Sequence, residues 1–206
     1  MRDLRDDIRD AFEHDHAATT VALARRWLED DPQDWQVWGW YGTMLYQMAR
    51  YDEAVAALEK KIEHIPPQGL VYAYCRMGHL YRYRGDYPQA ETWYQKAIDY
   101  DPTDATAYIY LGAALAQQGK LREAESAHRA GTRCEDGCID EAYHNLGLVL
   151  RGQGRLREAR ECFVKAVEMD PEYADALEVL DDVNIALMVG PDDATEQDAV
   201  PGRQSD

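Results

Sequence analysis

A block of residues that recurs at a nearly constant spacing limits the possible folds of this chain more than any other feature. The segment from Tyr108 to Gly112 reappears about 35 residues later as Tyr143 to Gly147. Both segments are followed by an apolar stretch, a second glycine and the residues Leu-Arg-Glu-Ala. Similar segments lie upstream and end at Gly42 and Gly78. A period of this length is typical of repeat proteins, in which each unit packs against its neighbours.

With units that start at residues 35, 71, 105 and 140, the same kinds of residue occupy the same positions. The fourth position is aromatic: Trp38, Tyr74, Tyr108 and Tyr143. The eighth is glycine: Gly42, Gly78, Gly112 and Gly147. The twentieth is alanine: Ala54, Ala90, Ala124 and Ala159. Proline closes three of the units, namely Pro66, Pro102 and Pro171, and Asp136 takes its place in the unit that starts at 105.

The spacing within each unit predicts two helices. Apolar and small residues at positions 4, 7, 8 and 11 recur at helical intervals, and those at positions 17, 20, 24 and 27 do the same. Gly85, Gly119 and Gly154 lie between the two stripes, where the chain must turn. Small residues at positions 8 and 20 allow the two helices to approach closely. We therefore expect helical hairpins that bury their apolar faces by stacking on one another.

These residues resemble the tetratricopeptide repeat (TPR) family, whose signature places an aromatic residue, a glycine, an alanine and a closing proline at these positions. The resemblance covers most of the chain. It implies an all-α fold, a right-handed α-α superhelix (a TPR solenoid) of about five helix hairpins plus a C-terminal capping helix. Lys61 departs from the family pattern, because it stands at position 27 of its unit, where a small residue is expected.

The predicted organisation begins with a degenerate hairpin at residues 1–34, which is marked only by its closing Pro32. TPR units are expected at 35–70, 71–104, 105–139 and 140–173. A capping helix is predicted at 174–189, because apolar residues follow helical spacing there with acids between them. Its apolar residues are Leu177, Leu180, Val183 and Leu187. Residues 190–206 are polar, acidic and free of aromatic side chains, which predicts a disordered acidic tail.

The net charge of −17 excludes some classes of partner. A chain this acidic is repelled by phosphate backbones, so we expect no general binding of nucleic acid. An anionic membrane surface is disfavoured for the same reason. The N-terminal residues lack the apolar core of a secretory signal, which predicts a cytoplasmic protein. Its four cysteines are then expected to be free thiols, although the spacing of Cys134 and Cys138 also suits a disulfide or a redox pair.

The sequence shows no motif of a known catalytic site. Phosphate loops, the nucleophile elbow, the zinc-protease helix and the dinucleotide fingerprint are all missing from the sequence. Cys134 and Cys138 lack the further ligands that a zinc site would need nearby. We therefore expect a non-enzymatic protein without a cofactor or a bound metal.

The resemblance implies that the first helix of each unit lines a concave groove in which peptides bind. Residues at positions 2, 5, 9, 12 and 13, with position 6 beside them, are the candidates. Aromatic and arginine side chains are frequent among them, and these are the usual anchors of interfaces. The selected candidates are Trp40, Thr43, Gln47, Tyr72, Arg76, His79, Arg82, Tyr83, Tyr110, Gln117, His144, Asn145 and Arg151.

The predicted function is that of a protein-binding adaptor or co-chaperone-like scaffold. Its arginines favour a protein or peptide ligand that is acidic or has a free C-terminus. TPR domains that clamp chaperone C-termini carry lysine and asparagine at positions 5 and 9, and here Gly39 and Thr43 stand there. We therefore expect no clamp of that kind. The alternative is a structural subunit or self-assembling solenoid, and the expected state is a monomer or a weak homo-oligomer.

Overall fold

Antiparallel helix pairs follow one another along residues 3–189, the part of the chain that this computed structural model describes. Those residues form eleven α-helices, one short 3-10 helix at Pro67–Gly69 and no strand longer than an isolated bridge. The α-helices are α1 (Leu4–Glu13), α2 (Ala17–Asp30), α3 (Trp35–Gln47), α4 (Tyr51–His64), α5 (Leu70–Tyr83), α6 (Tyr87–Tyr100), α7 (Ala105–Gln117), α8 (Leu121–Gly131), α9 (Ile139–Gly152), α10 (Leu156–Met169) and α11 (Ala174–Val189). The all-α solenoid predicted from the repeats is confirmed.

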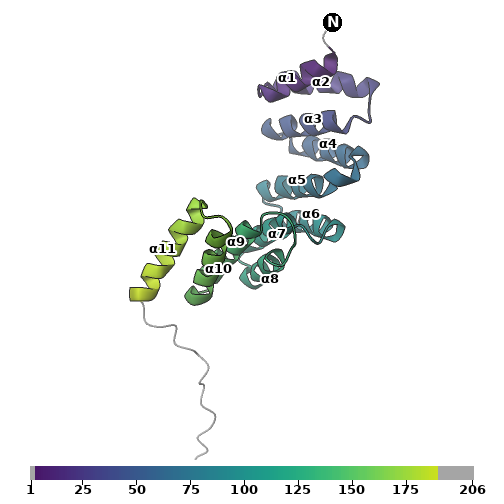
Figure 1. The fold of residues 1–206 in the computed structure, drawn as a ribbon. Coiled ribbons are helices and arrows are strands. Elements are labelled where there is room, and N and C mark those ends of the chain that lie inside the picture. Colours follow the sequence, from purple (N-terminus) through teal and green to yellow (C-terminus); the bar gives the residue numbers. More distant parts are fainter. Residues whose placement is uncertain (1–2, 190–206) are drawn as a thin grey trace, which may run out of the picture.

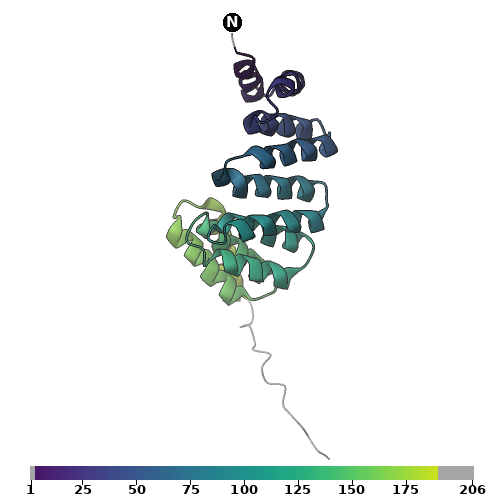
Figure 2. The same ribbon diagram turned by 90° about the vertical axis from the view of Figure 1, so that its right-hand side faces the viewer.

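The pairs stack in the order of the sequence and the stack curves (Figure 1). In Figure 1 the pairs descend from α1 and α2 at the top, and α9–α11 lie to one side with steeply tilted axes. Figure 2 shows the same pairs from the side as successive rungs. Each helix packs mainly on those just before and just after it, as expected of a solenoid. The acidic tail predicted at 190–206 lies outside the described residues.

Aspartates begin several helices by accepting hydrogen bonds from backbone amides of the first turn. The Asp34 carboxylate accepts from the amides of Gln36 and Val37 at 3.1 Å each. Asp104 accepts from the amide of Thr106 at 2.8 Å, and so begins α7. Such caps satisfy donors that have no partner within the helix.

The turns inside the hairpins all need a left-handed residue, but glycine does not always supply it. Gly85, Gly119 and Gly154 have φ values of 78°, 76° and 79°. In the first two hairpins Asp15 and Ala49 take that conformation, with φ of 59° and 58°. These two residues lack the glycine signal that predicts the other three turns from the sequence.

Each glycine at position 8 provides the space for a large side chain from the second helix of its hairpin. A Cβ atom on Gly78 would lie 2.4 Å from the ring of Tyr94. The same atom on Gly147 would lie 2.5 Å from the ring of Phe163. The alanines at position 20 are all fully buried: Ala54, Ala90, Ala124 and Ala159. The close approach of paired helices therefore depends on these small residues.

The buried surface of the first helices is wider than the predicted stripe. Positions 3 and 10 are buried in every unit: Val37, Ala73, Ala107, Ala142, Met44, Leu80, Ala114 and Val149. Position 5, which was predicted to face the groove, is also buried: Gly39, Cys75, Ile109 and His144. The physical reason is that a first helix contacts the preceding hairpin as well as its own partner helix. The groove is therefore narrower than the sequence predicted.

Candidate protein-binding groove

Lys61 places a cation where the other repeats have only a small side chain. The equivalent residues Ala97, Gly131 and Ala166 are buried between helices. A lysine side chain is too long for such a buried position, and that of Lys61 instead crosses Gly39 of α3. Its Nζ atom lies 3.2 Å from the point where a Cβ atom of residue 39 would stand. The absence of a side chain at Gly39 thus gives the Lys61 ammonium access to the groove.

Two aromatic rings lie close to this ammonium group, and no carboxylate within residues 3–189 forms an ion pair with it. Lys61 Nζ lies 5.9 Å from the centre of the Trp35 ring and 5.5 Å from that of Tyr72. Ring faces attract cations at such distances. Burial, and secondarily the charge of Arg76, lowers the pKa of Lys61. Within residues 3–189 no ion pair of Lys61 or Arg76 is present.

A cavity of about 450 Å³ opens beside Lys61 and Arg76, between α3 and α5. Four of its ten lining residues are aromatic, and none is acidic. The lining residues are Phe12, Trp35, Gln36, Gly39, Trp40, Thr43, Leu58, Lys61, Tyr72 and Arg76. The size and the mixture of rings with a few polar groups are typical of ligand sites.

Two further hollows extend this cavity along the first helices. One shares Thr43, Leu58 and Arg76 with it and reaches Tyr46 and Tyr83. The other, of about 250 Å³, shares Tyr72 and Arg76 and reaches Tyr110 on α7. We call the three together the α3–α5–α7 groove. Arg76 lines all three hollows, so it stands at the centre of the groove.

His79 is held within this groove by two tyrosines. Its Nδ1 atom shares a hydrogen bond with the Tyr94 hydroxyl at 2.9 Å, and its ring stands edge-on to that of Tyr110 at 4.3 Å. Burial, with smaller effects of Arg82 and Arg76, lowers the pKa of His79 to about 4. The imidazole is therefore neutral near pH 7 and offers hydrogen bonding rather than charge.

Arg82 lies against the groove residue Tyr83, although it lines none of the three hollows itself. Its Nε atom is buried and has no hydrogen-bond partner in residues 3–189. The guanidinium lies 5.2 Å from the centre of the Tyr83 ring. Neighbouring cations outside the groove behave differently, since Lys60 pairs with Glu63 and Arg84 with Asp52. The cations that line the groove, Lys61 and Arg76, therefore have no ion pair within residues 3–189, in an otherwise acidic chain.

The structure brings together most of the predicted site residues of the first three units and disperses the rest. Trp40, Thr43, Tyr72, Arg76, His79, Tyr83 and Tyr110 line the α3–α5–α7 groove. Gln47 and Gln117 are exposed and line none of its three hollows. Arg82 and Asn145 line none of them either. Lys61 was not among the predicted site residues, although its departure from the repeat pattern was a signal.

Two predicted groove residues of the last unit, His144 and Arg151, are engaged by residues from the C-terminal end of the stack. His144 is buried, and its ring packs against Phe163 and Tyr173 with a hydrogen bond of 3.2 Å to the Tyr173 hydroxyl. Its prediction as a groove residue is therefore wrong. Arg151 forms an ion pair of 3.1 Å with Asp182 of α11. The predicted positive groove thus loses Arg151, because the capping helix neutralises it.

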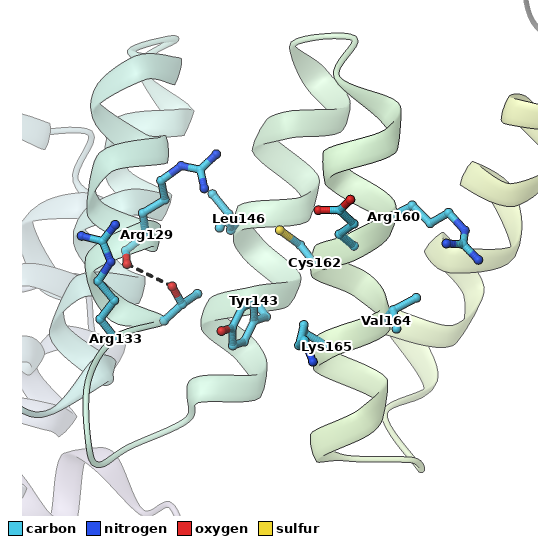
Figure 3. Close-up of a pocket in the computed structure, with 10 residues that line it drawn as sticks. Arg129, Arg133, Tyr143, Leu146, Arg160, Cys162, Val164 and Lys165 are labelled. Carbon is cyan, nitrogen blue, oxygen red and sulfur yellow. Dashed lines mark hydrogen bonds between the residues drawn. The ribbon is translucent and has the colours of Figure 1, made fainter. Parts of the chain in front are cut away.

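A second basic cavity, of about 530 Å³, lies between α8, α9 and α10 (Figure 3). Two of the four basic residues that line it are ion-paired within the protein. Arg129 pairs with Glu125 and Glu158, while Lys165 pairs with Glu168. Figure 3 also shows the Thr132 hydroxyl donating to the Arg129 carbonyl oxygen, at 3.0 Å. The acidic residue Glu161 also lines this cavity, whereas no acidic residue lines the cavity beside Lys61.

No group of three or more metal-ligating side chains occurs among residues 3–189. No helix in that range combines the length and apolar character needed to cross a bilayer. All four cysteines are free.

Stacked helical hairpins with a cationic and aromatic groove define a repeat scaffold that binds other proteins. Three family models agree with this class. Two that describe tetratricopeptide repeats match residues 8–69 and 140–173, and one that describes a TPR repeat matches 78–119. Together they cover more than half of the chain, which belongs to the tetratricopeptide repeat family. Members of this family are typically non-catalytic scaffolds for protein interaction.

Curated relatives match only in part. The cytochrome c-type biogenesis protein CycH of Rhizobium meliloti is 33% identical over 115 residues, which are 53% of this chain and 29% of CycH. The protein O-mannosyl-transferase TMTC2 of Homo sapiens is 30% identical over 88 residues, 41% of this chain and 10% of TMTC2. The chain therefore spans less than a third of either relative.

Solved structures match the fold along most of the chain. The C-terminal part of a TPR protein from Cytophaga hutchinsonii has a TM-score of 0.72 at 18% identity, covering 90% of this chain and 72% of that one. YrrB, described as having an unusual peptide-binding site, has a TM-score of 0.61 at 21% identity, covering 84% of this chain and 87% of YrrB. The first TPR domain of Spaghetti (RPAP3), bound to the HSP90 peptide SRMEEVD, has a TM-score of 0.55 at 22% identity, covering 60% of this chain and 99% of that domain.

Proposed function

We propose that this chain is an adaptor that binds an acidic segment of another protein in the α3–α5–α7 groove. The observation that carries the proposal is the pair of cations Lys61 and Arg76, which line one cavity and form no ion pair within residues 3–189, in a chain with net charge −17. Carboxylates of a ligand would supply the missing counter-ions. The exposed rings of Tyr72 and Tyr83 would cover the apolar parts of the bound segment.

Relatives of known structure support this mode of binding. The peptide bound to the RPAP3 domain contains three acidic residues, and YrrB is described as binding a peptide. A co-chaperone-like role would be one form of such an adaptor. The proposed compartment is the cytoplasm, because free thiols persist in reducing surroundings.

An array of acidic, neutral and basic decapeptides, each with a free and an amidated C-terminus, tests the proposal. We expect acidic peptides to bind, and to bind more weakly in about 0.3 M salt than in about 0.05 M salt, since exposed charges are screened. Arg76→Glu should weaken their binding by about tenfold or more, because Arg76 lines all three hollows. Arg84→Glu changes the net charge equally but lies outside the groove, so it serves as the control. Equal loss in both variants, or no preference for acidic peptides, would contradict the proposal.

A structural subunit or self-assembling solenoid is a second candidate, and the surface of α11 favours it. Ile185, Met188 and Val189 are 63%, 83% and 82% exposed. Apolar side chains this exposed are typical of contact surfaces. Light scattering over a range of concentrations distinguishes the candidates, because self-assembly raises the measured mass with concentration whereas an adaptor monomer keeps it constant.

A further inference from the structure

The cavity beside Lys61 contains two cations and a surplus of aromatic surface that a simple acidic peptide would not use fully. Lys61 and Arg76 both line it, and neither has an acidic partner within residues 3–189. A single carboxylate would leave one positive charge without compensation. A ligand group that carries two negative charges would compensate both.

The polar groups of the cavity suit an oxyanion with several acceptor atoms. Lys61 and Arg76 are donors only. The Thr43 hydroxyl already donates to the Gly39 carbonyl at 2.9 Å. Gln36 accepts a hydrogen bond from Arg5 through its Oε1 atom, which leaves its amide nitrogen free to donate. A phosphoryl group has three strong acceptor oxygens and a charge close to −2 near neutral pH, which matches this set of donors.

The walls of the cavity indicate what the anionic group is attached to. Phe12, Trp35, Trp40 and Tyr72 line it. The rings of Phe12 and Trp40 already contact each other at 5.9 Å between centroids. A phosphate ion alone would leave most of the 450 Å³ to water. An aromatic ring that carries the phosphate would instead lie against these side chains in an offset or edge-on arrangement.

We infer that this cavity is a subsite for a phosphorylated aromatic side chain, that is, a phosphotyrosine of the bound segment. The inference rests on the proposed function, since the phosphotyrosine would belong to the acidic segment in the α3–α5–α7 groove. Arg76 stands where this cavity meets the rest of the groove. Phosphorylation of the partner would then control its binding.

Three small probes separate charge from shape with the full chain at about pH 7.5, where phenyl phosphate is mostly dianionic. Benzenesulfonate has the same tetrahedral head with one charge, and phenylacetate has one carboxylate. Tryptophan fluorescence or calorimetry reports binding, since Trp35 and Trp40 line the cavity. We expect phenyl phosphate to bind about tenfold or more tightly than either monoanion. Equal binding of the three would overturn the assignment of a dianion.

Variants locate the probe. Lys61→Met and Arg76→Met should each weaken phenyl phosphate binding by about tenfold or more. Lys60→Met is the matched control, because Lys60 is the preceding residue and is already paired with Glu63 at 2.8 Å. Loss of phenyl phosphate binding in Lys60→Met to the same extent would show that the cavity is not the site. The comparison of probes on the unaltered chain needs no variant and stands even if one of them fails to fold.

Peptides decide between this inference and the proposed function. An acidic decapeptide with a central phosphotyrosine should bind about tenfold or more tightly than the same peptide with tyrosine or phosphoserine. If acidic peptides bind in the groove but phosphotyrosine adds nothing, the inference is overturned and the proposed function stands. If phosphoserine equals phosphotyrosine, the aromatic part of the inference is wrong. If no acidic peptide binds, with or without phosphotyrosine, the proposed function is wrong and the inference that rests on it is overturned as well.

Discussion

The Nζ atom of Lys61 lies 3.2 Å from the point at which residue 39 would carry a Cβ atom if it were not glycine. The ammonium group of Lys61, a residue of α4, thus reaches the groove across α3 through the space beside Gly39. A larger residue at position 39 should displace the Lys61 side chain without removing its charge from the protein.

Gly39→Ile tests this relationship, because Ile109 occupies the equivalent position and is buried. We expect acidic decapeptides to bind about tenfold more weakly, since the cation would leave its aromatic surroundings. The helix content measured by circular dichroism should remain that of the original chain. Unchanged peptide affinity together with an intact fold would show that Lys61 does not act in the groove.

Ala90 and Ala159 are fully buried where the two helices of a hairpin meet. Ala90→Leu or Ala159→Leu should lower the free energy of unfolding by about 1–3 kcal/mol or more, because the added side chain separates the paired helices. Chemical denaturation measures the loss. Gln89→Leu is the control for Ala90, since Gln89 is the exposed preceding residue. If both leucine variants melt like the original chain, the repeats have been aligned in the wrong phase.

Gly147 and Gly152 lie on the same helix, α9, but in different surroundings. A Cβ atom on Gly147 would lie 2.5 Å from Phe163, whereas nothing lies within 4 Å of one on Gly152. Gly147→Ala should therefore lower the free energy of unfolding by about 1–3 kcal/mol. Gly152→Ala should change it by less than about 1 kcal/mol, in the stabilising direction. Similar thermal melting of the two variants would contradict the close approach of α9 and α10.

His128 introduces a pH-dependent component of stability. It is 1% exposed, and burial lowers its pKa from 6.5 to about 4. The unfolded chain therefore binds a proton more readily than the folded one, so stability is full above pH 6.5 and falls as the pH drops towards 4. Between pH 7 and pH 5 the contribution of this residue should decrease by about 2 kcal/mol.

His128→Phe isolates that effect, because Phe163 occupies the equivalent position of the next unit beneath Gly147. We expect the variant to lose less stability than the original chain between pH 7 and pH 5, by the amount that His128 contributes. His79 and His144 also have lowered pKa values, but they titrate in both proteins and cancel in the comparison. Parallel pH profiles of the two proteins would show that His128 accepts its proton without a penalty.

Much of the fold was predictable because the determinants of a repeat are local. The glycine and alanine at positions 8 and 20 identify the helix pairs, since only small residues permit their close approach. Gly85, Gly119 and Gly154 identify three of the turns. The turn at Ala49 was not predicted, because the left-handed conformation of this residue depends on the surrounding hairpin rather than on its own preference.

The candidate groove was predictable only in part. Arg76 and His79 were found because they lie on a first helix, where the family pattern places ligand contacts. His144 was misplaced because Tyr173, which lies 29 residues later in the chain, packs against its ring. Arg151 was misplaced for a related reason, since α11 brings Asp182 to it.

By itself the sequence determined the repeating hairpins of this chain, because helix spacing, small residues and turn glycines act over a few neighbouring positions. Only the tertiary structure decided which cations remain unpaired. Lys61 and Arg76 come from different helices, and both belong to one cavity because Gly39 lets the lysine side chain cross α3. Charge compensation depends on distances between residues far apart in the chain, and these distances are set by how the hairpins stack.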